Sequence, residues 1–306
     1  MINSQLAVLN AHSDQDLLHQ ATSVFDLLDV SASTRYDYQA RIGVFLSFIR
    51  EHGLDRNSFL AFKRSLADRT DISVSTKNKL LVTARILLKE LNRQGVLPVD
   101  VTQNIKSFSQ SRKHKKDGLT DAEVARVGRY LQLLPRTPEN ARLKAIISLL
   151  TLQGLRQIEA VRLNVNDLHL ARGIAYVQGK GRDDKEAVSL HPETVRLLRV
   201  YLASNKVADG ALFTSNSNNS LRQRLTTRSV QRLVSEVFQK LGIAKSVHGL
   251  RHFYASKLIR AYEGDLLQVA RYTRHSSIST LQVYFDDVQA EADLPRYYQT
   301  FEDVKL

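Results

Sequence analysis

A short polar and basic segment divides the 306-residue sequence into two parts that are expected to fold separately. Residues 106–118 are rich in Lys, Ser and Arg and show no apolar periodicity, which is typical of an interdomain linker. Thr120 and Glu123 follow at the spacing of a capping box, a signature of a helix N-terminus. We therefore predict an N-terminal domain over 1–105, the linker 106–118 and a second domain over 119–306.

The first part has the apolar periodicity of helices and no strand signal. Helices are predicted from about Ser33 to Gly53, over 58–69, and from about Ser75 to the stop signals Gly95 and Pro98. The buried stripes are expected to consist of Ile42, Phe45, Leu46 and Ile49 in the first helix and of Leu80, Leu81, Ala84, Leu87, Leu88 and Leu91 in the third.

The second part mixes helices with one β-hairpin. Two short, partly alternating segments, 173–178 and 185–190, flank the Gly-rich turn 179–184, which is typical of a hairpin. Helical patterns cover 141–153, a segment beginning at Pro192, 227–241 and 247–259. The predicted fold class is therefore mainly α with a small antiparallel β-sheet, in which a helical domain precedes a mixed α+β domain.

Composition narrows the function. The 44 Lys and Arg against 31 Asp and Glu give a net charge of +13, which favours a polyanionic partner such as nucleic acid. The absence of cysteine excludes disulfides, thiolate catalysis and Cys-ligated metals. The N-terminus lacks a signal-peptide pattern, and the longest apolar stretch, 145–155, is far shorter than the ~18 residues of a membrane span. We expect a soluble, cytoplasmic, nucleoid-associated protein with no membrane partner.

Five polar motifs in the second part carry residue types that handle phosphate groups. Each motif alone is unspecific, since a Gly-Leu-Arg at a helix end is usually a cap and a His-x-x-Arg is usually a surface feature. The motifs are Gly154-Leu155-Arg156 with Glu159, Gly179-Lys180-Gly181, His248-Gly249-Leu250-Arg251-His252, Arg274-His275, and Leu281 to Tyr284.

In their order and spacing, the five motifs resemble those of the tyrosine recombinases, also called the phage integrase family. The two catalytic arginines of that family match Arg156 and Arg251, and its β-hairpin lysine matches Lys180. Its second histidine falls on His275 and its nucleophile on Tyr284. The first part of the chain resembles the helical core-binding domain of the family, so the resemblance covers the whole chain and makes residues 119–306 the catalytic domain.

The resemblance implies cleavage and rejoining of DNA through a 3′-phosphotyrosyl link at Tyr284, without metal, cofactor or ATP. Arg156 and Arg251 would present forked guanidinium groups to the non-bridging phosphate oxygens. Lys180 would protonate the leaving 5′ oxygen, because an ammonium can deliver a proton where a guanidinium cannot. An ordinary phenol has a pKa of about 10, so Tyr284 is expected to be activated by the surrounding positive charge.

The remaining motif residues receive supporting roles. His248 and His275 are expected to donate hydrogen bonds to the phosphate, and His248 also to help take the phenolic proton. Glu159, one helical turn after Arg156, is expected to orient the site, and His252 to be structural.

Two departures from the family pattern are visible. Thr273-Arg274 stands where the family commonly has Leu-Gly before the second histidine, so the local backbone is expected to differ. The residues after Tyr284 are Phe285, Asp286 and Asp287, which are more acidic than in many relatives. Neither change removes a reactive group.

Basic residues outside the catalytic motifs are predicted to contact the DNA backbone. They lie at helical spacing in the first part, in the linker, and near the start of the helix at 227–241. They are Arg85, Lys89, Arg93, Lys113, Lys115, Lys116, Arg224, Arg228 and Arg232.

The predicted function is therefore site-specific DNA recombination by integration, excision or resolution, on double-stranded DNA and as a homotetramer on paired sites. Two alternatives remain. A metal-dependent nuclease would use His248 and His252 as ligands, but Gly249 stands where a zincin-type motif has Glu. A catalytically inactive DNA-binding or architectural relative of the same fold is the other alternative.

Overall fold

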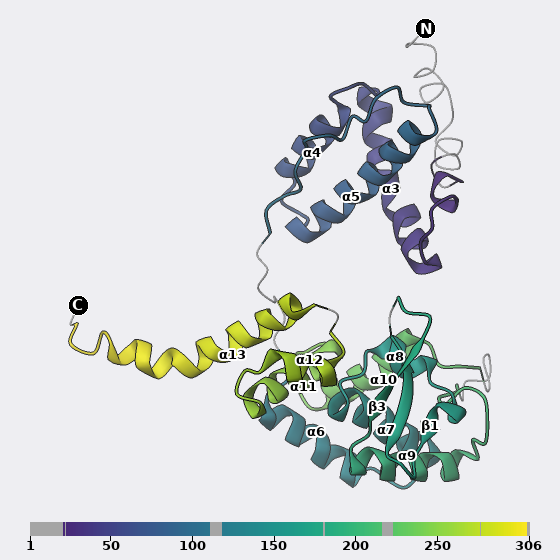
Figure 1. Cartoon of the computed structure of the whole chain (residues 1–306), viewed down its shortest axis with the longest axis vertical. Coiled ribbons are helices and arrows are strands. Elements are labelled where there is room, and N and C mark those ends of the chain that lie inside the picture. Colours follow the sequence, from purple (N-terminus) through teal and green to yellow (C-terminus); the bar gives the residue numbers. More distant parts are fainter. Residues whose placement is uncertain are drawn as a thin grey trace. The chain divides into compact units, whose positions relative to one another are not determined.

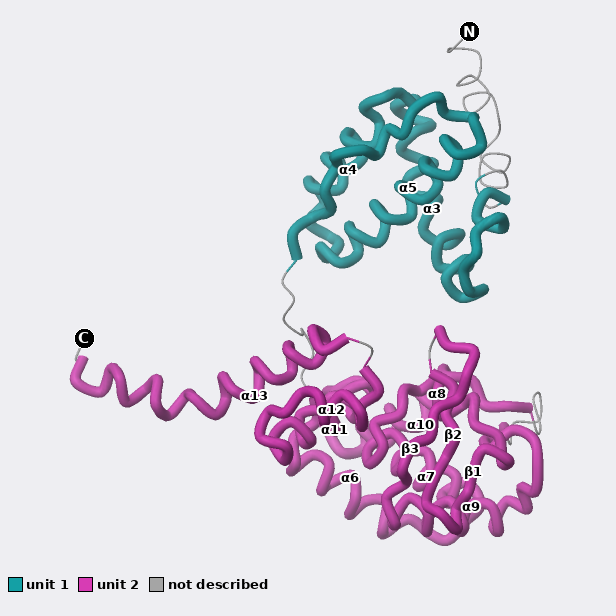
Figure 2. The backbone as a smooth tube through the Cα atoms, in the orientation of Figure 1, with its two compact units in different colours: residues 1–111 teal, residues 112–306 magenta. Residues whose placement is uncertain are grey.

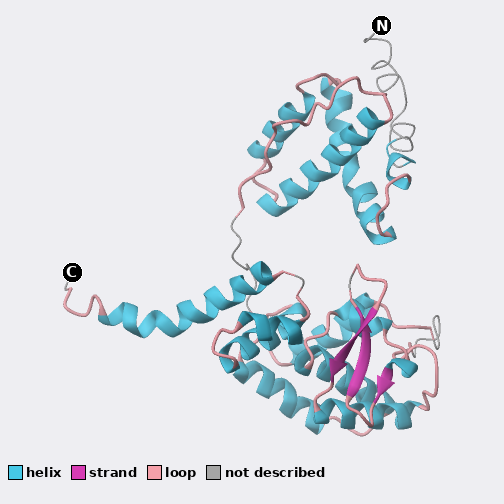
Figure 3. Ribbon diagram, viewed as in Figure 1, coloured by secondary structure: helices cyan, strands magenta, loops and turns pink. Residues whose placement is uncertain are grey.

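The computed structural model describes residues 21, 23–110, 118–179, 181–215, 223–275 and 277–304. The chain divides into two compact units, 1–111 and 112–306, which Figure 2 shows in different colours. The boundary between the units falls inside the basic segment 106–118. Helices dominate both units, and the strands of the described residues form one small antiparallel sheet (Figure 3). This confirms the predicted fold class.

The described residues of the first unit form helices joined by loops and include no strand. Its helices are α3 (Ala32–His52), α4 (Ser58–Asp68) and α5 (Val74–Arg93), close to the predicted ranges. Ser31 and Ser73 cap α3 and α5 by accepting hydrogen bonds from backbone N–H groups three residues later. The predicted apolar stripes are buried, together with Phe25, Phe59, Phe62 and Leu66.

The second unit places its helices around the sheet (Figure 1). The capping box is confirmed, since Thr120 accepts from the Glu123 amide and Glu123 accepts from the Thr120 amide at 2.8 Å. The elements are α6 (Asp121–Leu133), α7 (Pro138–Leu152), α8 (Gln157–Arg162), a 3₁₀ turn (Val165–Asp167), β1 (Leu168–His169), β2 (Ile174–Gln178), β3 (Lys185–Ser189), α9 (Pro192–Asn205), α10 (Thr227–Lys240), α11 (His248–Ala261), α12 (Leu266–Thr273) and α13 (Ile278–Gln299).

The predicted hairpin is confirmed as β2 and β3, whose antiparallel register pairs Ile174 with Ser189 and Gln178 with Lys185. Ala175 and Val177 are buried on one face while Tyr176 between them is exposed, as period-two alternation requires. The two-residue strand β1 pairs with β2 at the outer edge and was not predicted, because two residues are too few to show alternation.

Helix α7 is the centre of the core of the second unit. Its residues 145–150 are all buried, because α8, α9, α10 and α11 contact it from different sides. A smaller apolar cluster joins α11, α12 and α13 through Ala255, Ile259, Val269, Leu281 and Tyr284. In α13 only the first half contributes to this cluster, since residues 289–304 are all exposed.

Gly154 turns the chain from α7 into α8 and so sets the direction of Arg156. Its φ of +57° lies in the left-handed region, which disfavours any residue with a Cβ. A Cβ at this position would also lie 2.2 Å from Cδ1 of Tyr254 on α11. The turn therefore requires glycine for two independent reasons.

Gly154→Ala is expected to destabilise the protein more than Gly242→Ala, a matched control. Gly242 has a similar φ of +64° but nothing within 4 Å of an added Cβ. The control should lose about 1 kcal/mol for the left-handed backbone. Gly154→Ala should lose roughly 1–3 kcal/mol more, because the tyrosine ring must move. Free energies of unfolding from urea titration measure both, and equal losses would contradict the steric argument.

Candidate active site

Arg156 stands at the N-terminus of α8 and is held by Glu159 of the same helix. The Arg156 amide donates to Oε2 of Glu159 at 2.8 Å, and its Nη1 donates to Oε1 at 2.7 Å. The carboxylate is fully buried, whereas 30% of the Arg156 side chain is exposed. Arg156 therefore has a fixed base and an accessible guanidinium, as a phosphate-binding group needs.

Arg251, on α11, is the most buried of the predicted catalytic residues that the structure describes, with 3% of its surface exposed. Its Nη1 donates to the carbonyl of Gly154, and its Nη2 donates to the carbonyl of Thr273 at 2.6 Å. Burial, together with the nearby Arg156 charge, lowers its pKa to about 10. The guanidinium therefore stays charged at neutral pH while it ties the α7–α8 turn to the end of α12.

His275 follows α12 and faces Arg251. The hydroxyl of Thr273 donates to the carbonyl of Val269, so it can only accept from Nδ1 of His275, 2.8 Å away. Nε2 is then unprotonated and accepts from Nη2 of Arg251 at 3.3 Å. Burial and the surrounding arginines lower the pKa of His275 to about 3, so the ring is neutral. In this state the histidine orients Arg251, whereas we had expected it to donate to the phosphate.

Tyr284 lies on the first half of α13 and is 4% exposed. Its ring centroid is 4.9 Å from that of His252 and 6.2 Å from that of His275. Burial raises the pKa of the Tyr284 phenol, although the charges of Arg251 and Arg156 act in the opposite direction. Burial thus outweighs the arginines in the protein without DNA, and the activation of this phenol by positive charge stays a prediction for the DNA-bound state.

The two other motif histidines, His248 and His252, both lie on α11. His248 begins α11 and is exposed, and its ring centroid is 4.8 Å from that of buried His252. The predicted acid Lys180 lies outside the described residues, as do Lys113, Lys115 and Lys116.

Sequence reasoning noted Arg274 only as a departure from the family pattern. In the structure its side chain is buried and pairs with Glu159 at 2.9 Å. No local sequence signal indicates this contact, because the two residues are far apart in the chain. The unusual arginine before His275 was the one available hint.

Several predicted DNA-contacting residues have partners inside their own unit. Arg85 donates to the carbonyl of Ile105 and lies over the ring of Phe59. Arg224 precedes α10 instead of lying on it, and it donates to the carbonyls of Val161 and Leu163. Both arginines thus have structural roles.

The other predicted contacts that the structure describes are exposed, as Arg224 also is. Lys89 lies 3.9 Å from Asp100, Arg93 pairs with Glu90, and Arg232 lies 3.6 Å from Glu236. Arg228 is exposed on α10. The assignment of these residues to DNA contact stays a prediction.

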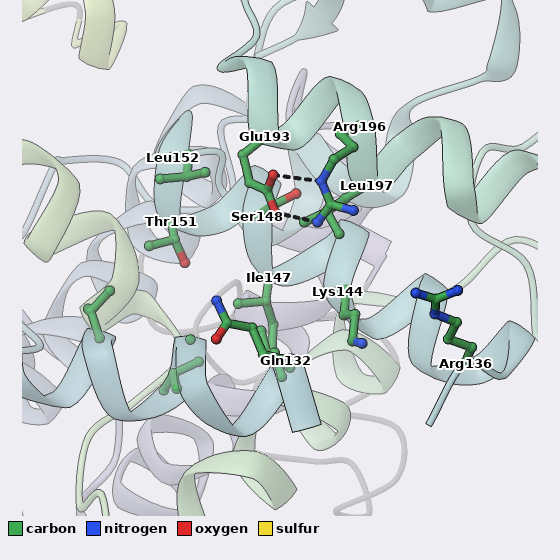
Figure 4. Close-up of a pocket in the computed structure, with 14 residues that line it drawn as sticks. Gln132, Arg136, Lys144, Ile147, Ser148, Thr151, Leu152, Glu193, Arg196 and Leu197 are labelled. Carbon is green, nitrogen blue, oxygen red and sulfur yellow. Dashed lines mark hydrogen bonds and ion pairs between the residues drawn. The ribbon is translucent and has the colours of Figure 1, made fainter. Parts of the chain in front are cut away.

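The described residues contain no group of three or more His, Cys, Asp or Glu side chains that could hold a metal ion. Their helices also include none that is long and apolar enough to cross a membrane. A hollow of about 440 Å³ lies between α6, α7 and α9, with the Arg196–Glu193 pair on its wall (Figure 4). None of the predicted catalytic residues lines it.

Comparison with known proteins agrees with this arrangement. The sequence model described as the phage integrase family matches residues 119–291, which is more than half of the chain. The chain belongs to the phage integrase family. This family member is 27% identical to the tyrosine recombinase XerD of Oceanobacillus iheyensis, over 89% of its own length and 93% of that relative. It is 32% identical to the tyrosine recombinase XerC of Neisseria meningitidis serogroup C, over 76% and 74% of the two chains.

Solved structures share the fold of this family member. The XerH recombinase bound to a palindromic difH substrate in a post-cleavage complex matches with a TM-score of 0.71 and 20% identity, covering 86% of this chain and 79% of that one. A lambda integrase tetramer bound to a Holliday junction matches with a TM-score of 0.65 and 15% identity, covering 92% and 80%. At these identities the likeness shows the fold alone.

His275→Gln is expected to weaken the dependence of stability on pH. The unfolded chain binds a proton at this histidine below about pH 6.5, whereas the native chain binds it only near pH 3. The free energy of unfolding of the wild type must therefore fall as the pH drops through this window. The slope is set by the difference in protons bound by the unfolded and native states, to which this group contributes at most one. Glutamine cannot take up the proton. Urea titrations between pH 7 and pH 4 measure the two slopes, and identical slopes would contradict a neutral buried His275.

Proposed function

We propose that this chain is a site-specific DNA recombinase that cleaves and rejoins DNA by transesterification. The observation that carries the proposal is that Arg156, Arg251, His275 and Tyr284, from four separate motifs, meet in one cluster of the second unit. Two arginines beside a tyrosine are suited to phosphoryl transfer from a nucleic acid, because they oppose the negative charge that develops on the phosphate.

In the proposed reaction, Oη of Tyr284 attacks the scissile phosphorus and the bond from phosphorus to the 5′ oxygen breaks. The guanidinium groups of Arg156 and Arg251 hold the non-bridging oxygens. Lys180 supplies the proton to the leaving 5′ oxygen, and His248 takes the phenolic proton. The product is a 3′-phosphotyrosyl link and a free 5′ hydroxyl. Because the phosphoester bond is kept, the reverse reaction rejoins DNA without ATP, cofactor or metal.

The raised pKa of Tyr284 gives the proposed reaction a dependence on DNA. Without a phosphate in the site, burial keeps the phenol protonated and a poor nucleophile. A bound phosphate brings the substrate to the arginines, and deprotonation then requires a base. The proposed role of His248 follows from its position at the exposed start of α11, beside the His252 ring that contacts Tyr284.

The helical first unit is proposed to hold the DNA together with the second unit, and Arg228 and Arg232 of α10 to contact its backbone. Two of the solved relatives are described as complexes with DNA, one of them as a tetramer on a Holliday junction. We extend both properties to this chain and propose a homotetramer on paired sites. The exposed second half of α13 is suited to such assembly. Its apolar side chains are Leu294, Tyr297, Tyr298 and Phe301, each between 42% and 63% exposed.

Tyr284→Phe is expected to abolish covalent attachment to DNA and to leave DNA binding intact, because it removes only the attacking oxygen. The substrate is a nicked half site selected by binding to the wild-type chain from a random-sequence DNA pool. Denaturing gels measure the adduct, and gel shifts measure binding. A wild-type chain that binds DNA but forms no adduct would favour the inactive DNA-binding alternative. A covalent adduct formed by Tyr284→Phe would show that another residue is the nucleophile.

The same assay tests Lys180 with a substrate in which sulfur replaces the bridging 5′ oxygen. A thiolate leaves without a proton, so Lys180→Ala should cleave this substrate at close to the wild-type rate. Arg251→Ala should stay slow on both substrates, because its role is to oppose charge on the non-bridging oxygens. Equal behaviour of the two variants would contradict this division of roles.

Deleting residues 294–306 is expected to spare binding to a single site and to impair pairing of two sites. The deletion removes the exposed apolar ridge but leaves the buried cluster around Tyr284 intact. Gel shifts and sedimentation on one and two sites separate the two steps. Normal pairing by the truncated chain would show that this ridge has no part in assembly.

A further inference from the structure

Arg274 occupies a backbone position that normally suits glycine. It follows α12 with φ 55° and ψ 43°, in the left-handed region that disfavours side chains with a Cβ. Nevertheless, only 5% of its side chain is exposed. An arginine buried in an unfavourable backbone conformation indicates that its side-chain contacts hold it there.

Those contacts reach three other elements. Nη2 donates to Oε2 of Glu159 on α8 at 2.9 Å, and Nε lies 3.4 Å from Oε1 of Glu186 on β3. Nη1 lies 3.4 Å from the carbonyl of Gln153 at the end of α7. The residue directly after Arg274 is His275. One side chain thus connects the segments that carry Arg156, His275 and the β2–β3 hairpin.

The contacts form an alternating row of charges that runs Arg156, Glu159, Arg274, Glu186, Arg182. Its inner members, Glu159 and Arg274, are buried, whereas Arg182 at the hairpin turn is 44% exposed. The row carries one net positive charge, and without Arg274 it would carry none. Glu159 would then neutralise Arg156 completely.

Arg274 also limits how Glu159 can bind Arg156. Oε1 of Glu159 accepts from Nη1 of Arg156, while Oε2 is shared between the Arg156 amide and Arg274. Without Arg274, Oε2 has room to accept a second guanidinium N–H from Arg156. The forked pair that results would hold the guanidinium against the carboxylate. Two of the five guanidinium N–H groups would then be occupied, and the guanidinium would be turned toward the carboxylate and away from a phosphate.

We propose that Arg274 is a positioning residue for DNA cleavage, which by binding Glu159 keeps the Arg156 guanidinium out of a forked pair with that carboxylate and directed toward the scissile phosphate. This inference rests on the proposed function. It assigns a role to the arginine that this chain has where the family commonly has glycine.

Arg274→Gly tests the proposal with little backbone strain, because glycine suits the left-handed conformation. Cleavage of the selected half site is expected to slow roughly tenfold to a hundredfold, the effect of a misplaced catalytic group. Single-site binding should change less than threefold. Replacing the bridging 5′ oxygen by sulfur should not restore the rate, in contrast to Lys180→Ala, because Arg274 acts through Arg156 and not through the acid.

A double-mutant cycle with Arg156→Ala distinguishes positioning from general damage. If Arg274 acts through Arg156, the chain with both changes should cleave as slowly as Arg156→Ala alone. A second slowing of the same size in that background would overturn the proposal. Arg274→Lys keeps the buried positive charge. If Arg274→Gly does not fold, the same double-mutant cycle is measured with Arg274→Lys instead. Arg274→Lys is expected to cleave at a rate between those of the wild type and Arg274→Gly. Combined with Arg156→Ala, it should cause no further slowing.

Arg196→Ala is the matched control. Arg196 forms a forked pair with Glu193 on α9, at 2.6 and 2.8 Å, but both side chains are exposed and lie outside the catalytic cluster (Figure 4). It should cleave at the wild-type rate. Wild-type cleavage by Arg274→Gly would overturn this proposal alone, whereas a wild-type chain without any adduct would contradict the proposed function itself.

Discussion

The buried guanidinium of Arg251 is the interaction on which the cluster depends. It binds the carbonyl that precedes Arg156 by two residues, the carbonyl that precedes His275 by two residues, and the His275 ring itself. Helix α11, which carries it, also presents His252 to the ring of Tyr284. Three segments far apart in the sequence are therefore fixed relative to one another by one side chain. A lysine carries its three donors on one nitrogen and lacks the planar fork, so it would not reproduce the geometry of these contacts.

This arrangement concentrates positive charge in a largely buried cluster. Arg156, Arg251 and Arg274 lie around the single buried carboxylate of Glu159, whose pKa burial would raise but which Arg274 and Arg156 hold low. The carboxylate cannot neutralise three guanidinium groups, so the cluster has an excess of positive charge, and burial reduces the screening of that charge by solvent. In the proposed function, a phosphodiester supplies the missing negative charge. Burial is the main reason why His275 stays neutral, and the same excess adds to it, because a fourth positive charge among the arginines would be repelled.

Local patterns predicted most of the fold but not all of the site. The capping box, the hairpin alternation and the apolar stripes of α3 and α5 each depend on neighbours in sequence, and each was predicted correctly. The motifs identified Arg156, Arg251, His275 and Tyr284, which the structure brings together. Their protonation was less predictable, because burial decides the pKa of Tyr284 and sequence does not show burial. For Arg85 and Arg224, contact with DNA stays a prediction, but both side chains also donate to carbonyls within their own unit. Helical spacing shows that a basic side chain is near the surface but not that it caps a carbonyl of its own unit.

The burial of Tyr284 is the feature that best separates a reactive cluster from a merely basic surface. A tyrosine exposed beside three arginines would lose its proton more easily and could react with any nearby phosphoester. Here the phenol belongs to the apolar cluster of Ile259, Val269 and Leu281, and desolvation of its anion outweighs the arginine charges. In the proposed reaction, the arginines are therefore in place before Tyr284 loses its proton. Their charge would attract the phosphate and burial would keep the phenol protonated until DNA binds, so that both act on the same bond only in the complex with DNA.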